Sequence, residues 1–184
     1  VGLATNSVLN LQPTLFQVDP QTGHCTKIVE LAATIDTVAG ISFVPAGVLH
    51  PTEEVLIGLT YDCEYVRVSL TSGVVTVLGT IAPRCFNKSG DIVSVAGDAT
   101  YTALLVDRDA GTNDSLLVIN PVTGAQTANR GDVGQQGIGG LAFFRNKLYA
   151  FGVAGDVLSI DRQTGVSTLV LQMPGVRFTG AAVA

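Results

Sequence analysis

The sequence predicts an all-β protein built from four copies of one antiparallel sheet. Two observations support this fold class. Apolar residues alternate with Thr, Ser and Gly, which is typical of strands, and no helical spacing is needed to explain them. One turn pattern, apolar-[Asp/Asn/Ser]-x-x-[Thr/Ser]-Gly-x-x-Thr, recurs at residues 18–26, 68–76, 119–127 and 160–168.

The recurring turn has a physical explanation at each of its fixed positions. A short polar side chain at its start can accept hydrogen bonds from backbone N–H groups two and three residues later. Glycine supplies the positive φ that lets the chain reverse. Because Asn and Ser replace Asp, we interpret the motif as a backbone device and not as a catalytic site. The residues concerned are Asp19, Gly23, Ser69, Gly73, Asn120, Gly124, Asp161 and Gly165.

Each turn is predicted to join the last two strands of a four-stranded meander. In the fourth repeat the expected strands are 139–144, 147–152, 157–160 and 167–171. In the second they are 41–44, 54–60, 65–69 and 74–78. In the third they are 91–95, 101–106, 115–119 and 126–128, the last being the weakest because Asn129-Arg130-Gly131 follows it.

The first repeat is incomplete, with expected strands at 1–4, 14–18 and 26–31 and no innermost strand. The apolar segment 178–184 is a spare strand of suitable composition. We therefore expect both chain ends to complete one sheet. Two alternatives remain open: the spare strand is given to the next molecule in a head-to-tail chain, or the sequence is part of a larger ring.

These repeats resemble those of the β-propeller superfamily along essentially the whole chain. The apolar-Asp-x-x-Thr-Gly turn before a last strand is similar to the repeat of quinoprotein-type propellers and of many secreted bacterial propellers. The sequence has no Trp, which that quinoprotein repeat normally contains, so no quinone-binding expectation is carried over. The resemblance implies a single domain over residues 1–184, a four-bladed β-propeller of four-stranded antiparallel blades.

Composition excludes two classes of partner. The chain carries a net charge of -5 and has no cluster of Lys or Arg, so nucleic acid is not an expected partner. No apolar run approaches the roughly 20 residues that span a bilayer. The sequence starts at Val1 without an initiator Met, and we expect a processed chain or a segment of a longer one.

Two sequons, together with the low Lys content and the Thr-rich sheet pattern, favour an extracellular or cell-surface location. We predict a disulfide between Cys63 and Cys85, while Cys25 is interpreted as a small strand residue; the alternative is that all are buried thiols. Three cysteines without a Cys-x-x-Cys pair do not indicate zinc. The sequons at Asn87 and Asn113 predict glycosylation if the source is a eukaryote.

One acidic loop could present oxygen ligands to Ca²⁺, the only cofactor that the sequence suggests. Its candidate ligands are Asp107, Asp109, Asn113 and Asp114. The loop departs from the calcium pattern at Gly111, and the alternative is a solvated hairpin loop.

No catalytic constellation is evident. His24 and His50 are expected in polar turns, and adjacent Glu53 and Glu54 would point to opposite faces of a strand. Four arginines near repeat boundaries would cap sheet edges or line a channel: Arg84, Arg130, Arg145 and Arg177.

The sequence therefore favours a non-catalytic extracellular module for structure and interaction. Its expected partners are copies of itself or adjacent domains, assembled into a fibre or coat. A carbohydrate- or small-ligand-binding propeller is the alternative, and a propeller enzyme is the third choice.

Overall fold

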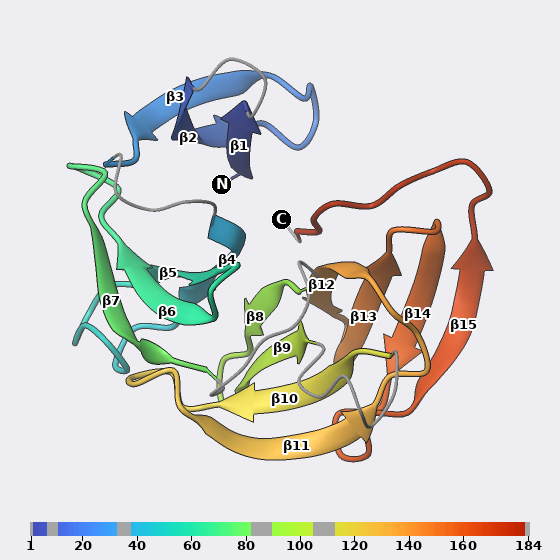
Figure 1. Cartoon of the computed structure of the whole chain (residues 1–184). Helices are drawn as coiled ribbons and strands as arrows, with labels where there is room; N and C mark the ends of the chain where they lie inside the picture. Colours follow the sequence, from blue (N-terminus) through green and yellow to red (C-terminus); the bar gives the residue numbers. More distant parts are fainter. Residues whose placement is uncertain (1, 7–10, 33–37, 82–89, 105–112, 183–184) are drawn as a thin grey trace.

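The computed structural model describes residues 2–6, 11–32, 38–81, 90–104 and 113–182. These residues form fifteen strands in four antiparallel sheets, and none of them is in a helix that could cross a membrane. The sheets stand around a common centre like the blades of a propeller (Figure 1). The prediction of an all-β, four-bladed propeller-like fold is confirmed.

The strands follow the chain within each sheet. The first sheet contains β1 (Gly2–Asn6), β2 (Leu11–Val18) and β3 (Cys25–Glu30). The second contains β4 (Val38–Val44), β5 (Val55–Thr60), β6 (Glu64–Val68) and β7 (Val75–Thr80). The third contains β8 (Ile92–Ser94), β9 (Thr100–Leu104), β10 (Ser115–Ile119) and β11 (Gln126–Asp132). The fourth contains β12 (Ile138–Phe144), β13 (Lys147–Gly152), β14 (Asp156–Ile160) and β15 (Ser167–Gln172).

The outer strand of the third sheet is longer than the sequence predicts. β11 continues through Asn129, Arg130 and Gly131 to Asp132. Asn129 and Gly131 pair with Leu117 and Leu116 of β10, and a register shift between these two pairs accommodates Arg130. The expectation of a weak last strand in this repeat is therefore wrong.

The expected completion of the first sheet is also corrected. Within the described chain this sheet has three strands, and residues 178–182 form no strand. The segment instead lies against Gly139 and Gly140 of β12. The Phe178 ring meets the Phe151 ring edge-on, with 5.3 Å between centroids. In Figure 1 the segment runs from β15 back to the centre of the molecule.

The hydrophobic core is divided into three clusters, each between neighbouring sheets. Leu31 and Val68 belong to the cluster between the first and second sheets. The second cluster includes Ile81 and Ile119, and the third includes Val133 and Ile160. The core thus consists mainly of junctions between sheets, and every residue of β5 and β9 is buried because both faces of these strands are covered.

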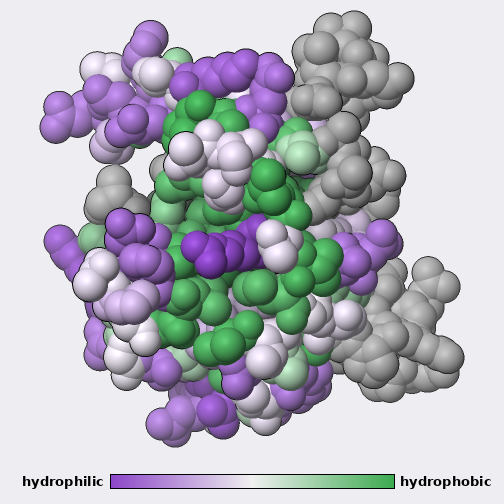
Figure 2. Space-filling model, turned by 90° about the vertical axis from the view of Figure 1, so that its left-hand side faces the viewer, coloured by the Kyte–Doolittle hydropathy of each residue, from purple (hydrophilic) through white to green (hydrophobic). Residues whose placement is uncertain are grey.

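Apolar side chains are also exposed on outer strands. Figure 2 shows the side of the molecule on which β7 lies, with a band of hydrophobic residues crossed by a hydrophilic group. Leu70, Val74 and Val77, on β7 and the turn before it, are exposed. On β15 the exposed apolar residues are consecutive: Leu169, Val170 and Leu171.

Candidate functional site

The four repeated turns share one geometry. Their glycines have φ values between 68° and 75°: Gly23, Gly73, Gly124 and Gly165. In the last turn, the Asp161 carboxylate accepts hydrogen bonds from the backbone N–H groups of Gln163 and Thr164, at 2.8 and 3.0 Å. These bonds lower the pKa of Asp161, and equivalent bonds from Gln21 and Thr22 lower the pKa of Asp19.

Three of these turns pack against the preceding sheet. A Cβ atom added to Gly73 would overlap the Glu30 carbonyl, and one added to Gly124 would overlap the Tyr65 ring. At Gly165 it would lie 2.8 Å from the Gly131 carbonyl oxygen. Nothing lies within 4 Å of the same position at Gly23. The first turn is therefore built like the others, but no described sheet packs against its glycine.

The apolar residue before each turn is buried in the last three repeats and exposed in the first. Val68, Ile119 and Ile160 are 3%, 2% and 4% exposed, because each enters the core junction with the preceding sheet. Val18 is 40% exposed. An apolar anchor is thus present in all four turns and covered in three.

In the first three sheets, the residue that follows the outer strand lies on the other side of the junction, facing the turn of the next sheet. Leu31, Ile81 and Val133 are at most 2% exposed, and each belongs to the same core cluster as the turn anchor of the following sheet. Met173 follows β15 in the same way, with its N–H donating to Gly155 O, but it is 38% exposed. Met173 of the fourth sheet and Val18 of the first sheet thus have the positions of the two sides of a junction, but both are exposed. We call each of these uncovered sides a half-junction.

Hydrogen bonds reinforce the filled junctions. Ala32 N donates to Gly73 O at 3.0 Å, and Gln126 N donates to Ile81 O at 3.2 Å. The Ser167 hydroxyl donates to Val133 O at 2.6 Å. Cys25 is the residue equivalent to Ser167 in the first turn, and it is exposed with a free thiol.

A buried carboxylate links the sheets near the centre. Asp91 accepts hydrogen bonds from the N–H groups of Ile92 at 2.8 Å and Leu141 at 2.9 Å, and also from the backbone of Ala181. Burial raises the pKa of Asp91 to about 7, although the backbone bonds act in the opposite direction. Asp91 thereby holds together β8, β12 and the segment after β15.

Asp114, one of the four predicted calcium ligands, is fully buried. Its carboxylate accepts a hydrogen bond from Ile138 N at 2.8 Å, so it fixes the start of β12. Asn113 donates from its side-chain amide to Asp132 at 3.1 Å. Asp107 and Asp109 lie outside the described residues. No group of metal-ligating side chains occurs in the described part of the chain. The calcium site therefore remains a proposal.

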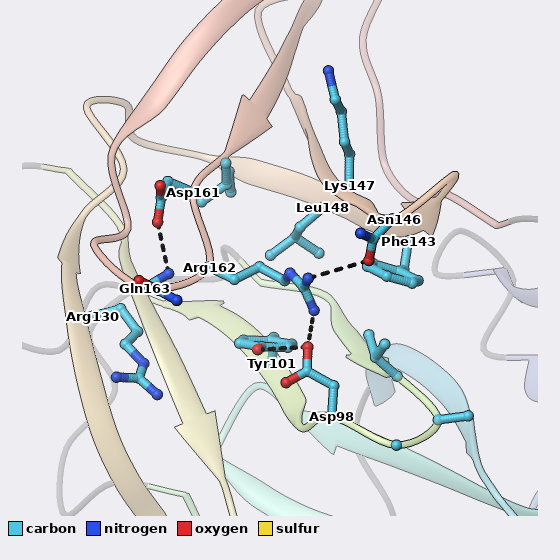
Figure 3. Close-up of a pocket in the computed structure, with 14 residues that line it drawn as sticks. Asp98, Tyr101, Arg130, Phe143, Asn146, Lys147, Leu148, Asp161, Arg162 and Gln163 are labelled. Carbon is cyan, nitrogen blue, oxygen red and sulfur yellow. Dashed lines mark hydrogen bonds and ion pairs between the residues drawn. The ribbon is translucent and has the colours of Figure 1, made fainter.

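A polar pocket of about 810 Å³ lies between the third and fourth sheets (Figure 3). Arg162 forms an ion pair with Asp98 and lies over the Phe143 ring, with its guanidinium 5.1 Å from the centroid. The Tyr101 hydroxyl donates to Asp98 at 3.1 Å. Arg130 lines the opposite wall and forms no ion pair with any described residue.

The remaining predicted residues are dispersed. Cys63 is buried at a positive φ of 64°, but Cys85 lies outside the described residues, so their disulfide stays a prediction. The same holds for glycosylation at Asn87 and for Arg84. Arg145 lies over Phe144 in the β12–β13 turn, and Arg177 is exposed. The exposed Glu53 and Glu54 precede β5, and Glu53 N donates to His50 Nδ1 at 3.2 Å.

Sequence reasoning missed Asp91 and the Asp98–Arg162 pair. Asp91 was detectable in the sequence. When the repeats are aligned, it takes the position that Gly40 has in the second repeat and Gly140 in the fourth. A carboxyl group in place of a repeated glycine indicates a special interaction. Asp98 and Arg162 are 64 residues apart, and no sequence spacing connects them.

Comparisons with known proteins support the fold. No protein-family model matches the sequence, and neither does any curated protein. A structural genomics protein of unknown function from Bacteroides thetaiotaomicron has a TM-score of 0.60 and 14% identity, over 90% of this chain and 44% of that chain. AztD from Citrobacter koseri gives a TM-score of 0.44 at 13% identity, covering 90% and 44% of the two chains. BamB from Moraxella catarrhalis gives 0.37 at 17%, covering 90% and 45%. The chain spans less than half the length of these proteins.

Proposed function

We propose that this chain is a non-catalytic structural and interaction module that associates with copies of itself. The observation that carries this proposal is the pair of uncovered half-junctions. Val18 and Gly23 form one half, and Met173 after β15 forms the other. Because the three internal junctions bury the equivalent residues, a second copy can supply the missing surface to each half.

The exposed apolar strand β15 supports self-association. Leu169, Val170 and Leu171 lie on the outermost strand of the last sheet, and no strand of the described part of the chain pairs with its outer edge. Contiguous exposed apolar residues commonly mark interaction sites, and unpaired strand edges invite pairing with another chain. Burial of Met173 and Val18 against each other would remove apolar surface from water on both copies.

An extracellular or cell-surface setting belongs to the same proposal. Its support is the low content of charged residues, 14%, together with the sequons at Asn87 and Asn113. A module with two different binding faces can build a closed ring, a fibre or a coat. Mass spectrometry of the secreted protein would test glycosylation, and an unmodified chain from eukaryotic cells would count against it.

Sedimentation velocity over a wide concentration range tests self-association. We expect discrete species heavier than the monomer, weakened by Met173→Asp. Val77→Asp, at an exposed position on β7 away from both half-junctions, is the matched control and should leave association unchanged. A wild-type chain that stays monomeric at the highest concentration would exclude this function.

A second candidate function is binding of a small anionic ligand, such as an acidic sugar. The specific observation is Arg130, which faces the pocket without a carboxylate partner among the described residues. Isothermal titration with glucuronate and galacturonate should give heat that Arg130→Ala abolishes. Arg177→Ala is the control, since this exposed arginine does not line the pocket. Absence of heat with both sugars would contradict this candidate.

A further inference from the structure

The segment after β15 has the sequence of an inner strand. Residues 38–44 read Val-Ala-Gly-Ile-Ser-Phe-Val, and residues 138–144 read Ile-Gly-Gly-Leu-Ala-Phe-Phe. Residues 178–184 read Phe-Thr-Gly-Ala-Ala-Val-Ala, with an apolar residue first and glycine third. In this alignment Gly180 corresponds to Gly40 and Gly140 of the two inner strands.

The segment also occupies the position of an inner strand beyond β12. The Cβ position of Gly40 lies 2.9 Å from Asp91 Cα and 3.1 Å from Ile92 N, at the start of the next sheet. The Cβ position of Gly140 lies 2.8 Å from Gly180 C and 2.9 Å from Ala181 N. Asp91 and Gly180 are aligned positions, so the same inter-sheet contact is made twice.

Among the described residues, the first sheet lacks the innermost strand that this segment resembles. β1 pairs with β2 and is the innermost strand of a three-stranded sheet, whereas the other sheets have a strand inside the equivalent one. Its inner edge therefore presents backbone groups suited to one more antiparallel strand.

We propose that residues 178–182 of one copy pair with β1 of a second copy and complete its sheet. This inference rests on the proposed self-association and names the contact that makes it. Own-chain pairing is disfavoured because Val18 and Met173, which such closure would bury, stay 40% and 38% exposed. Two reciprocal contacts would close two copies into one ring of eight sheets, and the structural match of TM-score 0.60 has about twice this chain's length.

The internal sheets fix the expected register. In the second sheet Gly40 pairs with Leu59, Leu59 with Tyr65, and Tyr65 with Gly79 just before a register shift. In the first sheet Leu15 pairs with Val29 just before the equivalent shift, and Leu3 pairs with Leu15. Leu3 is therefore the counterpart of Leu59. Gly180 of one copy should lie opposite Leu3 of the other.

Disulfide trapping tests this register in the full-length chain. Two variants, Leu3→Cys and Gly180→Cys, are prepared with Cys25→Ser to remove the exposed thiol. Nothing lies within 4 Å of the Cβ position of Gly180, so a cysteine fits there without overlap. Under mild oxidation, a mixture of the two should form a covalent dimer, and each variant alone should not. The control mixture of Ala4→Cys with Gly180→Cys should give roughly tenfold less, since neighbouring strand residues face opposite sides.

The outcomes separate this inference from the proposed function. A wild-type chain that never associates would overturn both. If the wild type associates but the Leu3–Gly180 mixture cross-links no more than its control, the strand contact is wrong and self-association stands. A chain carrying both cysteines should cross-link as a dimer. A cross-linked monomer would show pairing with its own β1 and would overturn the two-copy contact.

Discussion

The turns at Gly23 and Gly124 are alike in backbone and opposite in surroundings. Their φ values are 70° and 72°, and in each the glycine N–H donates at 2.8 Å to the carbonyl of the residue that starts the turn. The Gly124 turn lies on Tyr65 of the preceding sheet, whereas the Gly23 turn touches nothing at the same place.

This difference separates local folding chemistry from assembly. The first turn keeps its shape without a neighbouring sheet, so the motif itself determines the turn. Burial of the anchor before it depends on a neighbour. Val18 has the position of a buried anchor in its repeat, and no described sheet covers it.

The largest expected difference is between Gly124→Ala and Gly23→Ala. Both substitutions strain a positive φ, at a cost of about 1 kcal/mol. At Gly124 the new methyl group also overlaps the Tyr65 ring, which brings the total loss of unfolding free energy to about 3–4 kcal/mol. Urea denaturation of the monomer should show this difference in unfolding free energy between the two variants. Equal losses would mean that the junction at Tyr65 relaxes freely.

The pair Val68→Ala and Val18→Ala compares identical side chains at equivalent positions. Val68 is buried against Leu31, and its truncation should lower the unfolding free energy by about 2–3 kcal/mol. Val18→Ala should cost less than about 0.5 kcal/mol in the dilute monomer, because that side chain is largely exposed. At concentrations where copies associate, Val18→Ala should weaken the association. An unchanged association would show that Val18 is not an anchor.

Asp91 offers a test in the part of the molecule where the sheets do pack together. Burial raises its pKa from 3.8 to about 7, so the folded chain holds a proton that the unfolded chain has released between these pH values. The stability from the protonated carboxyl is complete below pH 3.8 and is lost as the pH rises through 7. We expect the unfolding free energy to fall by about 2.5 kcal/mol between pH 5 and pH 8.

The control for this pH effect is a pair of Asn variants. Asp91→Asn should remove the slope and lower stability, because an amide cannot accept all of the backbone hydrogen bonds that reach the carboxylate. Asp62→Asn, at an exposed position, should keep the wild-type slope. A slope that survives in Asp91→Asn would assign the pH effect to other groups.

The sequence predicts the repeated part of this molecule well and the contacts between repeats poorly. Strand positions and turn glycines follow from local patterns, which is why β10 and β13 have the predicted bounds. The segment 178–182 carries the pattern of an inner strand, but its contact with β12 depends on where the neighbouring sheet stands. The pocket between the third and fourth sheets was not predictable for the same reason, since Asp98 and Arg162 meet only through packing. The exposure of Val18 and Met173 likewise depends on how the described sheets pack and not on the local sequence.

The smallest expected effect is a loss of stability that should be equal in the uncovered first turn and the covered fourth turn. Asp19→Ala and Asp161→Ala each remove a carboxylate that accepts two backbone N–H bonds within an exposed turn. Both substitutions should shift the urea midpoint slightly and by the same amount. Because these bonds lower the pKa of both carboxyls, their contribution is present above pH 3.8 and disappears as the pH falls further. The variants should therefore converge with the wild type in acid. A much larger shift for Asp161→Ala would show that the junction stabilises the turn, and the separation between local chemistry and packing would then fail.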